Sequence, residues 1–554
     1  MSMTPGGPEY LDDQGPIDAA PANDNRKRLI VLGAIVAGGA VVAGGAWAAT
    51  SFFATGSQPA EALPDSTIAY VSVDIDPSGG QKIEAIKTLR KFPAFSDKIN
   101  LETDDDLRER FFEELTKSGE CEGIDYAEDV EPWLGSRAAM AAVDLGEDEP
   151  AAVGVVQVTD AGKTEDGVAT LIEACGGSTE EGSSDEGAEG EGDDVGGWVI
   201  EGDWMVLAET EEIAQQVMDA ADGASLAGDA SFEQWTGEAG EDGFISVYVA
   251  KAAAQYLEDA AGMGSMLGGL PSSPDDFTAE DPMAEEEVPE ELQQMIDDFD
   301  GLAATVRFDD GAVEVEYAMS NYQKDLTRFM ESDTGVGMVT SLPEDTVAAF
   351  GFSLKEGWAE AMLDYVKSTV PDESDTIDEQ LAQFESETGL AFPEDVETLL
   401  GEGVSVSLGS GIDPDAITNG GPGEVPAGIR IKGDADEIQA VLDKVAEVAG
   451  PEAAEFMQVS EGDGYAVLAL QDDYRGKLET GGDLGESDDY SKVIEGGDAQ
   501  SVLYVNFDAD DDWLVRVTED MPEVSENLAP LSALGVSGWV DGDVIHGMFK
   551  LTTD

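Results

Sequence analysis

An internal duplication constrains the fold of this chain more than any other feature. ALPDSTIAYVSVD at 62–74 matches SLPEDTVAAFGFS at 341–353, and GIDYAEDVEPWLG at 123–135 matches GLAFPEDVETLLG at 389–401. Three more matches follow in the same order: 150–156 with 426–432, 243–250 with 499–506, and 307–317 with 538–549. Because five ordered matches rarely arise by chance, the sequence indicates two copies of one unit.

Each copy combines the periodicities of strands and helices. Residues 67–74 and 151–158 alternate as strands do, whereas Val168, Leu171 and Cys175 recur at helical spacing. Strands joined by short turns outnumber alternating strand–helix units. We therefore predict an α+β fold, with internally duplicated antiparallel sheets and helices packed on one face. Whether the copies form one sheet or two is left open.

A long apolar run precedes the duplicated part. Basic residues at 26–28 are followed by 29–54, a run of 26 residues without a charge. As a helix this run would be about 39 Å long, against about 30 Å of hydrocarbon in a bilayer. It predicts one transmembrane helix, a signal anchor, which follows a disordered acidic cytoplasmic tail at 1–28. The alternative is a signal peptide cleaved near residues 46–48.

The positive-inside rule then places the rest of the chain outside the cytoplasm, as two repeats at 60–330 and 338–554. The first repeat carries acidic loops at 176–196 and 261–291. Four apolar residues near the start of the second loop follow helical spacing: Met263, Met266, Leu267 and Leu270. They fit a short helix on the sheet. A lip that contacts a lipid or a partner, and a disordered segment, are the alternatives.

Composition excludes several classes of function. The chain has 27 basic and 121 acidic residues, a formal net charge of −94. Such a chain repels phosphates, so we predict no binding to nucleic acid. One histidine and two cysteines exclude a zinc finger and a disulfide-dense scaffold, and no cofactor is predicted.

Three acidic clusters could attract a cation, but each has a simpler interpretation. Asp74 and Asp76 flank a strand-to-helix turn that has no acidic pair in the second copy. The cluster at 297–301 fails the EF-hand register, because Ile296 would stand at the first ligand position. Acidic runs such as 508–512 are expected in so acidic a chain. We therefore predict no metal site.

Cys121 and Cys175 lie only in the first copy and could form a disulfide outside the cytoplasm. The alignment of the copies places Cys175 at the core-facing position of Val445 and Cys121 at the polar position of Glu387. Two free thiols, one of them buried, are the alternative.

The chain offers little for catalysis. His546 is the only imidazole, and no nucleophile elbow, phosphate-binding loop or zinc-protease motif occurs. We assign no catalytic residue and predict that the protein is not an enzyme. A hydrolase that uses two carboxylates stays an alternative, because any two of the many acids could meet in a cleft.

The start LPDST–AYVSVDIDPSGGQ, the GIDYAEDVEPWLG block and the single leading apolar segment resemble an actinobacterial family of unknown function. Its members are exported, single-pass, membrane-anchored proteins. The resemblance covers about residues 60–554 and implies an outer α+β domain in the cell envelope. It supplies no activity and no catalytic residues.

These observations favour a membrane-anchored, extracytoplasmic protein that is a non-enzymatic binding module. Its expected contacts are the cell membrane through residues 29–54, and an envelope protein or an apolar ligand such as a lipid. A structural or scaffolding envelope protein is the alternative.

Overall fold

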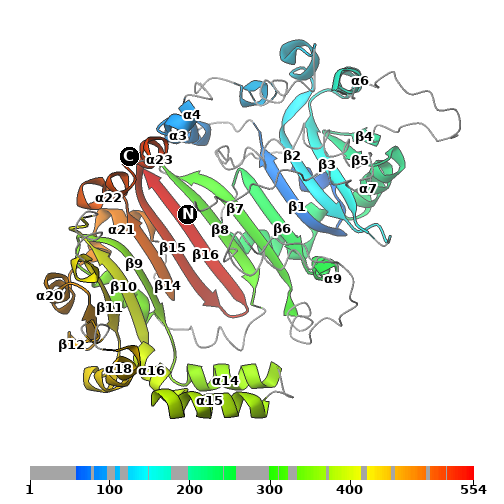
Figure 1. Ribbon diagram of the computed structural model, residues 1–554. Helices are drawn as coiled ribbons and strands as arrows, with labels where there is room; N and C mark the ends of the chain where they lie inside the picture. Colours follow the sequence, from blue (N-terminus) through cyan, green and yellow to red (C-terminus); the bar gives the residue numbers. More distant parts are fainter. Residues whose placement is uncertain are drawn as a thin grey trace, which may run out of the picture.

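The computed structural model describes residues 58–75, 80–96, 106–110, 112, 123–147, 149–175, 197–240, 243–257, 298–309, 311–321, 333–369, 374–413, 421–450, 454, 456–494, 499–519 and 521–554. Within them the chain forms one antiparallel sheet of 16 strands (Figure 1). The first eight strands are β1 (Thr67–Asp74), β2 (Leu134–Val143), β3 (Ala151–Val158), β4 (Gly197–Glu201), β5 (Trp204–Ala208), β6 (Ile245–Ala250), β7 (Gly301–Asp309) and β8 (Ala312–Ser320). The other eight are β9 (Thr346–Ser353), β10 (Gly403–Gly409), β11 (Ala427–Ile431), β12 (Ser460–Glu461), β13 (Ala466–Ala469), β14 (Ser501–Asn506), β15 (Leu531–Asp541) and β16 (Val544–Thr553).

The strand order reads the same from both edges of the sheet. It runs β12-β13-β11-β10-β9-β14-β15-β16-β8-β7-β6-β1-β2-β3-β5-β4, so each strand of the first half has its counterpart eight strands later in the chain. The two halves meet where β16 pairs with β8. The duplicated sequence thus builds one continuous sheet.

One face of this sheet is covered along its whole width. In the first half η2 (Pro59–Ala62), α7 (Glu211–Gly223) and α8 (Ala230–Glu238) pack on it around Tyr70, Trp235 and Tyr248. In the second half α13 (Thr334–Thr340), α20 (Asp472–Thr480) and α21 (Asp488–Val493) do so around Tyr474 and Tyr504. Helices α7, α8 and α21 begin at side-chain caps: the Asp229 carboxylate, for example, accepts from the first backbone N–H groups of α8.

Other helices pack on the opposite face, both at its margins and at one end of its central strands, where Ala85 packs against Phe308 and Val306. α6 (Ala161–Cys175) covers Val156 and Met205 at one side of the sheet, and α18 (Ala435–Ala449) covers Ile431 and Ala466 at the other. Figure 1 shows α3 (Gly80–Leu89), α4 (Pro93–Ser96) and α23 (Pro522–Leu528) at one end of the central strands, and α14 (Trp358–Thr369) and α15 (Ser374–Thr388) at the opposite end.

The remaining helices and turns are short. They are η3 (Tyr126–Val130), η4 (Leu226–Gly228), η5 (Lys251–Ala253), α9 (Ala254–Leu257), α16 (Glu394–Leu400), η8 (Pro422–Glu424), η9 (Leu484–Glu486) and α22 (Ala509–Val517).

The predicted fold class was wrong. It had helices packed on one face, whereas the structure has helices on both faces of the sheet. Whether the copies form one sheet or two was left open, and they form a single sheet. It also had a preceding transmembrane helix. No helix in the described part of the chain is long and apolar enough to cross a bilayer, and the predicted span at 29–54 lies outside that part.

Candidate functional site

The central strands bury one face and leave the other partly open. Along β7, β8 and β15 most buried side chains alternate with partly exposed ones and lie on the side of α8 and α21. Phe308, near the end of β7, is an exception: it is buried on the other face, against Ala85 of α3. We call the other set, on the eleven strands from β11 to β2 in the sheet order, the open face. A half-covered antiparallel sheet ordinarily shows polar side chains to water.

The open face is apolar instead. One row of directly paired residues crosses all eleven strands: Ile429, Val406, Phe350, Leu503, Val536, Phe549, Val315, Val306, Ile245, Val73 and Ala138. A second row lies beside it: Ile431, Val404, Phe352, Ser501, Gly538, Gly547, Tyr317, Ala304, Val247, Val71 and Met140. Its first two members are buried, Ile431 beneath α18. Neither row, in strands that the structure describes in full, contains a charged side chain.

Seven members of these rows are large apolar side chains between 36% and 42% exposed: Val71, Met140, Tyr317, Phe350, Val406, Ile429 and Leu503. Ten steps of about 4.8 Å between strands make the rows about 48 Å long. Contiguous apolar surfaces of this extent mark binding sites on proteins. The open face is therefore the candidate site.

Local packing shapes the surface. The Tyr317 ring lies over Gly547, where an added Cβ would come within 2.3 Å of the ring. Phe350 and Phe352 stand side by side with ring centroids 5.5 Å apart. The middle of the open face is thus a wide apolar surface, on which a flexible apolar molecule can bind in several positions.

The charges of the central strands lie on the covered face. Arg307 Nε is 2.7 Å from Glu314, and Lys550 also contacts Glu314, which is 2% exposed. Burying a charged side chain costs free energy unless an opposite charge pairs with it, and these three side chains are paired with one another. The pairing keeps these charges under the helices and away from the open face.

Most residues singled out from the sequence lie elsewhere. Met263, Met266, Leu267, Leu270 and Cys121 fall outside the described residues, as does the side chain of Cys175 at the end of α6. The lip and the disulfide therefore stay predictions.

The acidic clusters have structural partners. Asp510 pairs with Arg516 at 2.8 Å and accepts from the backbone N–H of Gly411 and Ile412. Asp300 accepts from Lys251 at 3.2 Å. The described residues contain no cluster of acids, histidines and cysteines that could hold a metal ion. His546, buried on the covered face, stacks on Trp539 at 5.1 Å between ring centroids.

Comparison with known proteins identifies a family of unknown function. Residues 30–413 match the family model described as protein of unknown function, DUF3352. The chain belongs to this family. No curated protein and no solved structure matches it. The resemblance to a family of unknown function is confirmed to that extent, and the match says nothing of actinobacterial origin or of membrane anchoring.

Proposed function

We propose that this member of the DUF3352 family is a non-enzymatic binding module that holds the acyl chains of a lipid on the open face. The observation that carries the proposal is the pair of uncharged rows across eleven strands. Such a surface offers contact area but almost no hydrogen bonds, so it favours a ligand that needs none.

Acyl chains fit this surface better than a polypeptide in extended form does. An extended peptide would bring backbone N–H and C=O groups against a face that cannot pair with them. A second copy of this chain would bring another charge of −94 toward the first, which opposes self-association. The length of about 48 Å exceeds the roughly 30 Å hydrocarbon thickness of a whole bilayer, so chains can lie end to end.

The test is the binding of a phosphatidylcholine that carries a pyrene-labelled acyl chain, supplied from vesicles to the full chain. Val406→Glu combined with Leu503→Glu puts two carboxylates into the middle of the open face. Each buried carboxylate costs more than about 1.4 kcal/mol against an acyl chain, so binding weakens at least about tenfold. Both positions are partly exposed, so we expect the unfolding temperature to change little.

Val448→Glu is the matched control, because Val448 is the most exposed large apolar residue described and lies in α18, outside the open face. It should bind the probe as the wild type does. Residues 29–54 are present in all variants, so a contribution from them cancels. Equal binding by the double variant, or none by the wild type, would contradict the proposal and favour the scaffolding alternative.

The same experiment separates binding from hydrolysis. Lipid recovered intact after long incubation agrees with a binding module. Release of a free labelled acid would instead favour the carboxylate-dependent hydrolase.

A further inference from the structure

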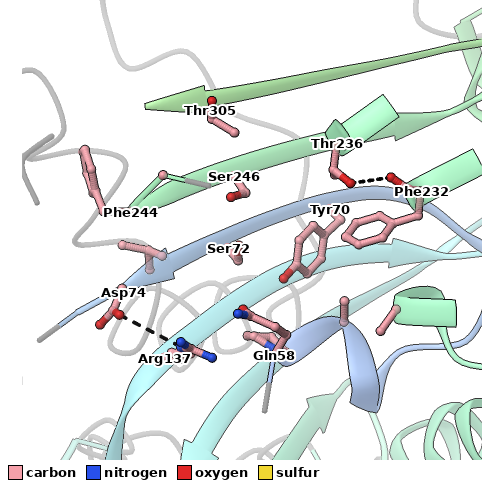
Figure 2. Close-up of a pocket in the computed structure, with 15 residues that line it drawn as sticks. Gln58, Tyr70, Ser72, Asp74, Arg137, Phe232, Thr236, Phe244, Ser246 and Thr305 are labelled. Carbon is pink, nitrogen blue, oxygen red and sulfur yellow. Dashed lines mark hydrogen bonds and ion pairs between the residues drawn. The ribbon is translucent and has the colours of Figure 1, made fainter. Parts of the chain in front are cut away.

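A small cavity on the covered face occurs in the first half of the sheet. Its volume is about 200 Å³, and β1, β2, β6, η2 and α8 contribute its walls. Figure 2 shows Asp74 and Arg137 at one end of the cavity and Phe232 and Thr236 of α8 at the other. The hydroxyl groups of Ser72 and Ser246 line the strand wall between them.

A buried acid and a buried base share the polar end of this cavity. Asp74 and Arg137 are register partners on β1 and β2, with side chains 9% and 6% exposed. Arg137 Nε lies 4.0 Å from Asp74 Oδ2, whereas the pair Arg307–Glu314 on the same face is closed to 2.7 Å. Both charged side chains line the cavity.

The second copy of the unit supplies an internal comparison. Tyr70, Ser72, Asp74 and Arg137 correspond in the aligned copies to Ala349, Gly351, Ser353 and Gly403. There α13 lies directly on the strands: Gly335 donates its N–H to Ser353 Oγ at 2.6 Å. A Cβ at Gly351 would come within 2.4 Å of Val339. The same strand pair therefore folds with small neutral residues, and the fold does not require the ion pair.

We propose that this cavity binds a small zwitterion of the α-amino acid class. The ligand ammonium group pairs with Asp74 and its carboxylate with Arg137, while Ser72 and Ser246 offer hydroxyl groups. Its side chain points toward Phe232 at the other end of the cavity. This site lies on the face opposite the proposed acyl-chain site and does not depend on it.

Charge and size select this class. Among the described residues that line the cavity, two are charged, and their charges sum to zero. A ligand with a net charge would therefore bring an unbalanced charge into a buried site. A zwitterion adds no net charge and matches both groups. Pockets of about 300–1,000 Å³ hold drug-sized ligands, so a cavity of this size takes a smaller molecule.

The test is calorimetric titration of the full chain with L-valine and three analogues. Isobutylamine keeps only the ammonium group, isovalerate keeps only the carboxylate, and isovaleramide is neutral. We expect L-valine to bind and each analogue to bind at least tenfold more weakly. The wild-type protein alone thus tests the proposal.

A pair of variants locates the binding. Asp74→Asn together with Arg137→Met removes both charges and leaves no single buried charge, and binding of L-valine should fall at least tenfold. Asp395→Asn is the control, since it breaks the 2.7 Å pair with Lys444 in the second half and should leave binding unchanged. No binding of L-valine to the wild type, equal binding of an analogue, or full binding by the double variant would overturn the proposal.

Discussion

At the scale of the residue, Arg430 shows how the covered face accommodates a charge without a carboxylate. Its side chain is fully buried and donates to the carbonyl oxygens of Leu478 and Ser341. Its guanidinium lies 4.5 Å from the centre of the Tyr465 ring. The planar fork of arginine suits several carbonyls at once, and this geometry ties β11 to α13 and α20.

Arg430→Lys should therefore destabilise the protein although it keeps the charge. One ammonium group cannot make all the hydrogen bonds that the guanidinium makes to separate carbonyl oxygens. We therefore expect a loss of about 2–4 kcal/mol in the free energy of unfolding. Arg516→Lys, at a partly exposed site, is the control and should change stability by less than about 1 kcal/mol. Denaturant titration measures both, and equal losses would refute this account of Arg430.

Asp508 gives a prediction about pH. Burial, reinforced by the carboxylates of Asp554 and Asp489, raises the pKa of Asp508 to about 6. The folded state then holds a proton that the unfolded state has released, so this residue's contribution to stability is complete below about pH 4 and is lost as the pH rises through 6.

Asp508→Asn keeps the side chain neutral at every pH. The variant should unfold at a higher temperature than the wild type at pH 7–8, and the difference should shrink as the pH falls toward 4. Asp472→Asn, with a side chain 95% exposed, should show no such trend. Thermal unfolding measured across this pH range gives the sign of the stability difference between variant and wild type. If the variant were less stable than the wild type at pH 8, this account of Asp508 would be wrong.

At the scale of the element, the sequence predicted many elements well. The strands at 67–74 and 151–158 and the helix that contains Val168 and Leu171 are confirmed. Strand periodicity and turn residues carry this information locally. Local signals do not say which face of a strand is buried, and this was the information the candidate site needed.

β8 illustrates the difficulty. Its sequence alternates Glu314, Val315, Glu316 and Tyr317, which by the usual rule puts the acids in water. In the structure Glu314 is buried with Arg307 and Lys550, while Val315 and Tyr317 belong to the open face. The pairing that reverses the pattern comes from β7 and β16, and β16 lies more than 200 residues away in the chain.

The close packing of helix α13 on β9 leads to a prediction about two glycine residues. It lies so close to β9 that a Cβ at Gly351 would meet Val339 at 2.4 Å and the Gly335 oxygen at 2.6 Å. Gly351→Ala should cost about 2–3 kcal/mol through overpacking. Gly337, in the same helix, has open space around it, so Gly337→Ala should stabilise by about 0.5–1 kcal/mol. Unfolding measurements that gave both substitutions the same sign would contradict this packing.

At the scale of the whole molecule, duplication explains why one face can stay open. Each half places most of its helices beneath the sheet and at its own outer margin. Joining the halves through β8 and β16 therefore leaves much of the middle of the other face uncovered, apart from the end of β7 that α3 covers. Repeats in a sequence do not reveal how their sheets join, and the single sheet was accordingly not predicted. The location outside the cytoplasm is untested by the described residues and stays a prediction.

The most direct measurement maps where an acyl chain rests on the full chain. A phosphatidylcholine with a diazirine in one acyl chain is bound, irradiated, and its cross-links are located by peptide mass spectrometry. We predict cross-links in peptides of β9, β10, β14 and β8, around Phe350, Val406, Leu503 and Tyr317, and their loss with Val406→Glu combined with Leu503→Glu. Cross-links spread over the helices of the covered face, or unchanged in the double variant, would contradict the assignment of the open face as a lipid-binding surface.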